Sequence, residues 1–146
     1  MIAHTIQLAL APVFLLVAIG NIMNILSQRL GRIVDRSRHL QQRHSETTGD
    51  EHDIVVREMR FIDRRIGMIG RAMLLLVISG ITVGVVVAML FLGEFMAVDL
   101  EGLAAGAFLL AIALLMGALL QFFKETREAA AALRIPEEFL ERHRDL

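Results

Sequence analysis

The chain has 146 residues, of which 55% are hydrophobic and none is cysteine, and its formal net charge at pH 7 is -1. The lack of cysteine excludes disulfides, iron–sulfur ligation, cysteine-type zinc sites and thiol catalysis. Apolar residues are concentrated in blocks and the mean hydropathy is +0.60, which is typical of a membrane protein and not of a soluble domain of this length.

Three uncharged stretches each contain about the 20 residues that a helix needs to span roughly 30 Å of hydrocarbon. They lie at residues 6–26, 72–92 and 103–123. We predict a helical hairpin at 27–67, a short connection at 93–102 and a helical tail at 124–146. The expected fold class is therefore all-α: one polytopic helical membrane domain whose first two spans extend into an antiparallel helical hairpin.

The charges predict the topology. Ten arginines lie between residues 29 and 71, whereas the connection at 93–102 carries Glu94, Asp99 and Glu101 and no Lys or Arg. By the positive-inside rule, the hairpin and the tail are cytoplasmic and the connection is external. The amino terminus is then outside and the carboxyl terminus is cytoplasmic.

One face of the first span stays polar or small and continues into the hairpin. We call this face the polar stripe; its members are His4, Gln7, Ala11, Phe14, Ala18, Asn21, Asn24, Gln28, Arg32, Asp35, His39 and Gln42. Their steps of three and four place them on one side of a helix. Because lipid does not tolerate an unpartnered polar face, we expect the stripe to be hidden or used inside an assembly.

Two interpretations of the stripe stay open. Asn21 and Asn24 are hydrogen-bond links between helices of one subunit, or several copies of the stripe line a pore. In a pore, Gln7 lies at the outer mouth and Phe14 forms an apolar constriction. The other lining residues are Ala18, Asn21 and Asn24, of which the two asparagines form neutral polar rings, followed by Gln28 and a charged cytoplasmic vestibule of Arg32 and Asp35.

The hairpin carries two matching heptad seams. Folding the chain back at residues 46–49 sets Leu26, Leu30, Ile33, Ser37 and Leu40 against Val55, Met59, Ile62, Ile66 and Ile69. The same register predicts the ion pairs Arg36 with Glu58 and Arg43 with Glu51. Gly49 is expected to close the first helix and Asp50 to cap the second.

Arg57, Arg60 and Arg64 are expected to face outward from the return helix of the hairpin. They belong to a repeated Arg-x-x-Arg-x-x-Asp-Arg pattern that begins at Arg29 and again at Arg57. One interpretation is that the pattern only satisfies topology and solvation. The other is a functional ring or a site for anionic lipid headgroups.

The sequence has no pattern that indicates an enzyme. It lacks a Gly-rich phosphate loop, a His-Glu-x-x-His motif, a nucleophile elbow and a pair of carboxylates within a span. The His and acidic residues at the hairpin tip have no specific metal-binding spacing and are typical of a solvated turn. We therefore expect no enzymatic activity, no cofactor, no metal and no nucleic-acid partner.

Three segments resemble a known bacterial family. They are IAHTIQLALAPVFLLVAIGNIMN, RLGRIVDRSR and REMRFIDRRIGMI, and they are similar to the membrane proteins called domain of unknown function 2721, over roughly residues 2 to 125. The resemblance implies a three-span protein of the bacterial inner membrane with no established activity.

Two functions follow as hypotheses. The first is a homo-oligomeric ion channel or pore lined by the polar stripe, because three spans with little polar interior do not enclose a path within one chain. The second is a non-conducting scaffold or regulator whose Arg-rich hairpin binds anionic lipid or a cytoplasmic partner. Expected partners are thus further copies of the chain and membrane lipids.

Overall fold

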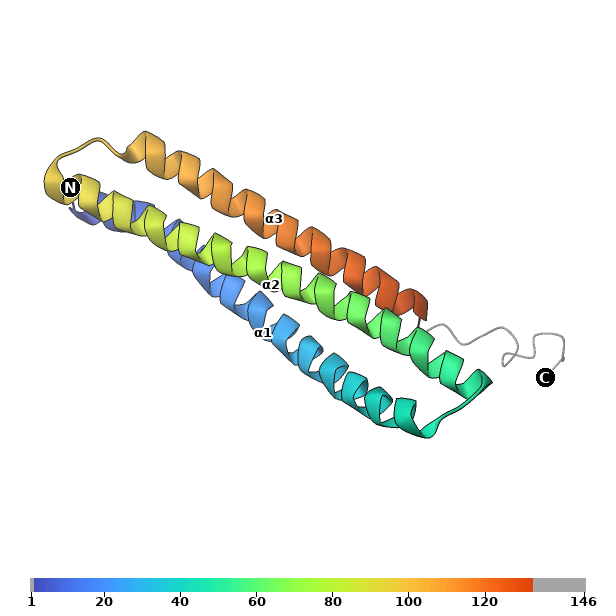
Figure 1. Cartoon of the computed structure of the whole chain (residues 1–146). Coiled ribbons are helices and arrows are strands. Elements are labelled where there is room, and N and C mark those ends of the chain that lie inside the picture. Colours follow the sequence, from blue (N-terminus) through green and yellow to red (C-terminus); the bar gives the residue numbers. More distant parts are fainter. Residues whose placement is uncertain (1, 133–146) are drawn as a thin grey trace, which may run out of the picture.

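The computed structural model describes residues 2–132, which form three long helices: α1 (Ile2–Glu46), α2 (Asp50–Met96) and α3 (Glu101–Ala132) (Figure 1). Each helix contains a stretch long and apolar enough to cross a membrane. The described residues contain no strand. The expected all-α, three-span class is confirmed.

The helix α2 lies between the other two helices and packs against both (Figure 1). The turn from α1 to α2 is at one end of the molecule, and the connection from α2 to α3 is at the other. At 1.5 Å per residue, α1 is about 68 Å long, more than twice the thickness of the hydrocarbon core of a bilayer. The first two helices therefore continue well beyond any membrane that they cross.

A strict seven-residue repeat joins α1 to α2. The buried residues of α1 include Thr5, Pro12, Ile19, Leu26, Ile33 and Leu40, and those of α2 include Val55, Ile62, Ile69, Leu76 and Val83. Such a repeat is typical of helices that supercoil left-handedly around each other. The predicted hairpin seam is thus part of a longer seam that runs through the spans as well.

The two predicted ion pairs of the hairpin are present and confirm its register. Arg36 Nη2 lies 2.7 Å from Glu58 Oε1, and Arg43 Nη2 forms an ion pair with Glu51 Oε1. Both pairs are partly exposed to solvent, so they select the register more than they stabilise the fold. The buried side chains of the seam supply most of the stabilisation.

The contact of α2 with α3 has a seven-residue repeat of small side chains. Ala72 and Ser79 of α2 are fully buried, as is Ala111 in the series Ala104, Ala111, Ala118 of α3. The Ser79 hydroxyl donates a 2.7 Å hydrogen bond to the Ala111 carbonyl oxygen. Small residues let two backbones approach closely, and this bond between a side chain and a backbone requires that approach.

The turn between α1 and α2 differs from the prediction at both residues, since α1 ends at Glu46 and is not closed by Gly49. Gly49 adopts φ 68° and is itself the residue before the first turn of α2, without a side-chain cap. Its carbonyl oxygen accepts a 3.2 Å hydrogen bond from the Asp53 amide. The prediction that Asp50 caps the helix is wrong, because Gly49, with a positive φ that glycine adopts easily, occupies the cap position and Asp50 is already helical.

Candidate functional site

The polar stripe lies on the side of α1 that faces away from α2. Gln7, Phe14, Asn21, Gln28 and Asp35 each follow a seam residue by two positions, which is a rotation of about 200° around a helix. Stripe and seam share the seven-residue period, so the stripe keeps its direction along the whole helix. All eight residues predicted to line a pore are exposed, and Phe14 is 70% exposed.

Asn21 and Asn24 do not link helices within this subunit. Both side chains are exposed, and the hydrogen bond that the structure places at Asn24 comes from Gln28 Nε2 on the same helix, at 3.4 Å. The interpretation in which they join helices of one subunit is therefore wrong. Two amides in the apolar part of a membrane helix are left for water or for another chain.

The charged end of the stripe is also free within the described residues. Arg32 and Asp35 are exposed, and neither forms an ion pair in the part of the chain that the structure covers. By contrast, Arg29 and Arg36, one on each side of Arg32, are both paired with glutamates. Between residues 29 and 36, the two charges without an ion pair therefore both lie on the stripe.

The three outward-facing arginines of α2 do not form one free group. All three are exposed, as predicted, but Arg64 Nη2 lies 3.2 Å from Glu128 Oε1 of α3. Within residues 2–132, Arg57 and Arg60 have no ion pair. Only these two remain available to a lipid headgroup or a partner.

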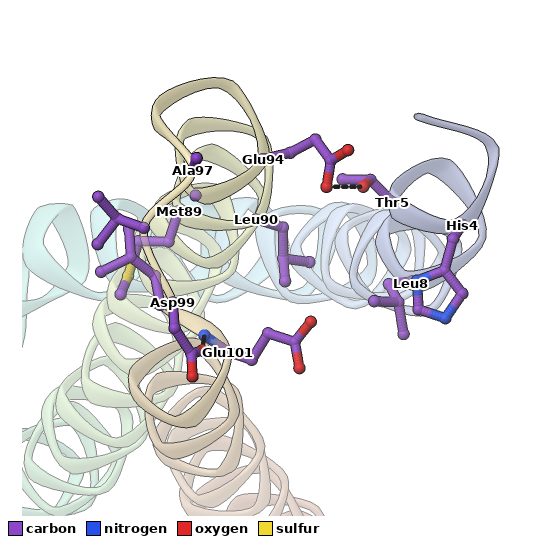
Figure 2. Close-up of a pocket in the computed structure, with 12 residues that line it drawn as sticks. His4, Thr5, Leu8, Met89, Leu90, Glu94, Ala97, Asp99 and Glu101 are labelled. Atoms are coloured by element: carbon purple, nitrogen blue, oxygen red, sulfur yellow. Dashed lines mark hydrogen bonds between the residues drawn. The ribbon is translucent and has the colours of Figure 1, made fainter. Parts of the chain in front are cut away.

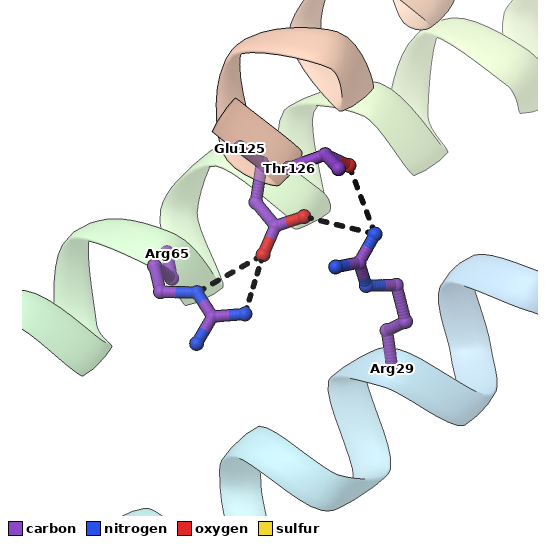
Figure 3. A network of polar contacts seen from close by, with 4 residues as sticks. All are labelled: Arg29, Arg65, Glu125 and Thr126. Atoms are coloured by element: carbon purple, nitrogen blue, oxygen red, sulfur yellow. Dashed lines mark hydrogen bonds and ion pairs between the residues drawn. The ribbon is translucent and has the colours of Figure 1, made fainter. Parts of the chain in front are cut away.

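Sequence reasoning missed the most buried charged residue, Glu125 of α3. Its side chain is 0% exposed, and Arg65 of α2 donates to its Oε1 atom from Nε at 3.0 Å and from Nη2 at 2.7 Å. Arg29 of α1 approaches Glu125 Oε2 to 3.5 Å and donates a 2.9 Å hydrogen bond to Thr126 Oγ1 (Figure 3). This group joins all three helices; we call it the arginine–glutamate node.

The position of Glu125 follows from the packing of α3. It lies seven residues after Ala118 in the series Ala104, Ala111, Ala118, and so occupies the same face of the helix. The face that buries alanine in the span buries a carboxylate just beyond it. The sequence signal is the seven-residue spacing that leads from Ala104 to Glu125, whereas the burial of this series, and with it the need for a basic partner, follows only from the packing of α3.

The node is built to hold helices together. Arg29 also lies over the Phe122 ring at 5.2 Å, and Arg65 over the Phe61 ring at 5.7 Å. The aromatic contacts and the carboxylate together fix both guanidinium groups. The start of the predicted tail therefore docks on the base of the hairpin. The rest of the helical tail predicted at 124–146 lies outside the described residues, which end at Ala132.

The structure places no metal-binding group in residues 2–132, since no three His, Asp or Glu side chains there are arranged to hold an ion. At the hairpin tip the rings of His44 and His52 are 4.4 Å apart, and His52 Nδ1 is 3.5 Å from the Thr47 hydroxyl. These contacts belong to the turn.

Comparison with known proteins gives one match. A family described as protein of unknown function (DUF2721) matches residues 9–135, which confirms the resemblance found in the sequence. No curated protein matches the chain, and no solved structure matches it.

Proposed function

For this chain, which belongs to the family of proteins of unknown function DUF2721, we propose the role of a subunit in a homo-oligomeric channel or pore lined by the polar stripe of α1. The observation that carries the proposal is the exposure of Asn21 and Asn24 on the face opposite the α1–α2 seam. The three apolar helices make the chain a membrane protein, and in a membrane that face requires a polar neighbour.

The cost of an uncovered stripe supports assembly. A polar group without a hydrogen bond in hydrocarbon costs several kcal/mol, and each subunit contributes Asn21 and Asn24. Covering them within the subunit would need a helix on the far side of α1, but α2 and α3 both lie on the seam side. Copies that meet around the stripe place the amides at a shared axis, where they bond each other or water.

The order of residues along the stripe suits a pore with a dry middle. Gln7 lies at one mouth, and Phe14 and Ala18 make an apolar segment that gates by excluding water. Asn21, Asn24 and Gln28 follow as neutral polar rings. Arg32 and Asp35 then place one positive and one negative charge of each subunit in the vestibule. Such a vestibule concentrates ions, and its preference for cations or for anions is weaker than that of a ring of charges of a single sign.

Flux tests the proposal directly. The variants Asn21→Leu and Asn24→Leu should abolish ion flux in reconstituted liposomes and leave the oligomer intact, because apolar rings dewet the path. The matched control is Thr82→Val, which removes a hydroxyl of α2 that donates, within the described residues, to the Ile78 carbonyl of its own helix. Wild-type protein that stays impermeable to small cations and anions across pH, divalent ions and membrane tension would contradict the channel.

The charge of the vestibule gives a second measurement. Arg32→Glu reverses one sign in every copy and should shift the ratio of cation to anion permeability toward cations. Added salt should weaken the shift, because the Debye length falls from about 10 Å at 0.1 M to about 3 Å at 1 M. Arg127→Gln, which changes an exposed arginine of α3, should leave the ratio unchanged.

The second candidate function is a non-conducting scaffold or regulator. It is favoured by Arg57 and Arg60, which are exposed and have no ion pair among residues 2–132. Such residues attract anionic lipid by about 1 kcal/mol each near a membrane surface. Binding of anionic vesicles by the reconstituted protein, lost in Arg57→Gln with Arg60→Gln and absent with neutral vesicles, would support it if wild type shows no flux.

The cellular location is part of the proposal. We infer insertion in a bacterial inner membrane with the hairpin and the carboxyl terminus in the cytoplasm, because the basic residues lie at that end of the molecule.

No reaction is assigned to the chain: the node is a set of paired charges without a nucleophile, and we propose that the protein is not an enzyme and needs no cofactor.

A further inference from the structure

Two adjoining cavities lie at the end of the molecule where α2 connects to α3. The first has a volume of about 360 Å³ and lies between the start of α1 and the connection (Figure 2). The second has a volume of about 240 Å³ and extends from there along the three helices. Both are lined by Leu8, Leu90 and Glu101, so together they form one continuous groove.

The first cavity is acidic. It is lined by the acidic residues Glu94, Asp99 and Glu101, and its one lining residue with a basic side chain is His4. No Lys or Arg occurs in residues 1–28 or 72–123, so this end of the bundle contains no arginine or lysine to balance three carboxylates. The cavity is within the size range of small-molecule sites, roughly 300–1,000 Å³.

Two of the three carboxylates have partners inside the chain. Glu94 Oε2 accepts a 3.4 Å hydrogen bond from the Thr5 hydroxyl, and Asp99 Oδ1 accepts a 3.2 Å bond from the Glu101 amide. Among residues 2–132 the side-chain carboxylate of Glu101 has neither a hydrogen bond nor an ion pair. Figure 2 shows the Glu94 and Glu101 carboxylates extending toward α1, with Leu90 between them.

The second cavity is apolar apart from that same carboxylate. It is lined by Pro12 of α1, Val86 of α2 and Phe108 of α3. Its floor is formed by the small side chains of Ala104 and Ala105. It lies along the apolar segments of all three helices. Glu101 is therefore the point at which an apolar groove meets an acidic cavity.

We propose that this groove binds one phospholipid whose headgroup carries a primary ammonium, as in phosphatidylethanolamine. An acyl chain fills the apolar cavity, and the ammonium donates to Glu101 and Glu94. Charge complementarity selects this headgroup: a primary ammonium has a positive charge and three donors, a choline group has the charge without a donor, and an anionic glycerol phosphate meets three like charges.

Native mass spectrometry of the whole purified protein with defined lipids tests the proposal. With acyl chains held constant, wild type should bind phosphatidylethanolamine about tenfold more tightly than phosphatidylcholine, an affinity difference of about 1.4 kcal/mol, and phosphatidylglycerol more weakly still. Glu101→Gln should bring the ethanolamine-to-choline ratio close to one. Glu46→Gln, an exposed carboxylate of the hairpin tip, should leave the ratio at its wild-type value.

A second variant tests the apolar part of the groove. Ala105→Phe fills it and should lower the affinity for all three lipids, whereas Ala113→Phe, exposed elsewhere on α3, should not. The proposal would be overturned if wild type bound the ethanolamine and choline lipids equally, or if Glu101→Gln left their ratio unchanged. It would also be overturned if the protein formed a lipid-free dimer that Ala105→Phe dissociates. Lipid binding is measured without flux, so its failure and that of the pore are distinguishable.

Discussion

Arg65 of α2 donates two hydrogen bonds to one oxygen of Glu125 in α3, from Nε at 3.0 Å and from Nη2 at 2.7 Å. The Glu125 side chain is 0% exposed and that of Arg65 is 19% exposed. A buried carboxylate is tolerated only when it is paired and hydrogen-bonded. This pair therefore fixes how far α3 can slide or rotate against α2 at the base of the hairpin.

The two residues of this pair should differ in their effect on stability. Arg65→Ala leaves Glu125 buried with only Arg29 at 3.5 Å and should lower the free energy of unfolding by about 3 kcal/mol. Glu125→Ala should cost about half as much, because both arginines are partly exposed and turn toward solvent. Reversible unfolding in mixed micelles measures both.

The exposed ion pair of Arg43 with Glu51 is the control for that measurement. Its side chains are 42% and 59% exposed, and Arg43→Ala should change the free energy of unfolding by less than about 1 kcal/mol. A loss for Arg65→Ala no larger than for Arg43→Ala would show that the node is not structural.

The hairpin seam should be sensitive to charge at Ile62. This side chain is 5% exposed, so Ile62→Asp buries an unpaired carboxylate and should cost several kcal/mol. Arg38→Ala, on the exposed side of α1, should have little effect. Thermal unfolding, followed by circular dichroism, compares the two variants. An equal effect of both changes on the unfolding temperature would contradict a buried seam at Ile62.

The alanine face of α3 should not accept a larger side chain. Ala111 is fully buried where its carbonyl accepts the Ser79 hydroxyl, so Ala111→Leu forces α3 away from α2 and should cost about 1 to 3 kcal/mol. Ala113→Leu, exposed on the same helix, should be neutral. Unfolding in mixed micelles separates the two, and a neutral Ala111→Leu would mean that the close approach is unnecessary.

The register of the hairpin was predictable because it depends on the spacing of residues within one short segment. The spacing of Leu26, Ile33 and Leu40 matches that of Val55, Ile62 and Ile69 in reverse, and only one alignment also places Arg36 beside Glu58. Both kinds of information lie within a short segment of sequence that the chain folds back on itself.

The node was not predictable in the same way. Its residues come from three helices, and the first and last of them, Arg29 and Glu125, are far apart in sequence. A glutamate in an Ala-rich tail is typical of a solvated helix, and only the burial of Ala118 one heptad earlier shows that Glu125 faces the bundle. The exposure of Asn21 was likewise undecided until the positions of α2 and α3 were known.

The predicted topology is tested with reporters. Enzymatic reporters inserted near Thr48 or fused after Leu146 should be active only in the cytoplasm, and one inserted near Val98 only outside, because the basic residues lie at the hairpin end. Activity of the Thr48 insertion on the external side would show that the hairpin is external. The stripe and the proposed vestibule would then have the opposite orientation in the membrane.

The most direct test of the pore uses the lack of native cysteine in the chain. A membrane-impermeant cationic thiol reagent should block flux through Asn21→Cys, since the added group fills a path that the stripe surrounds. It should leave Leu110→Cys, on the exposed face of α3, unaffected. Flux through Asn21→Cys that persists after complete modification of the thiol would contradict a path lined by α1.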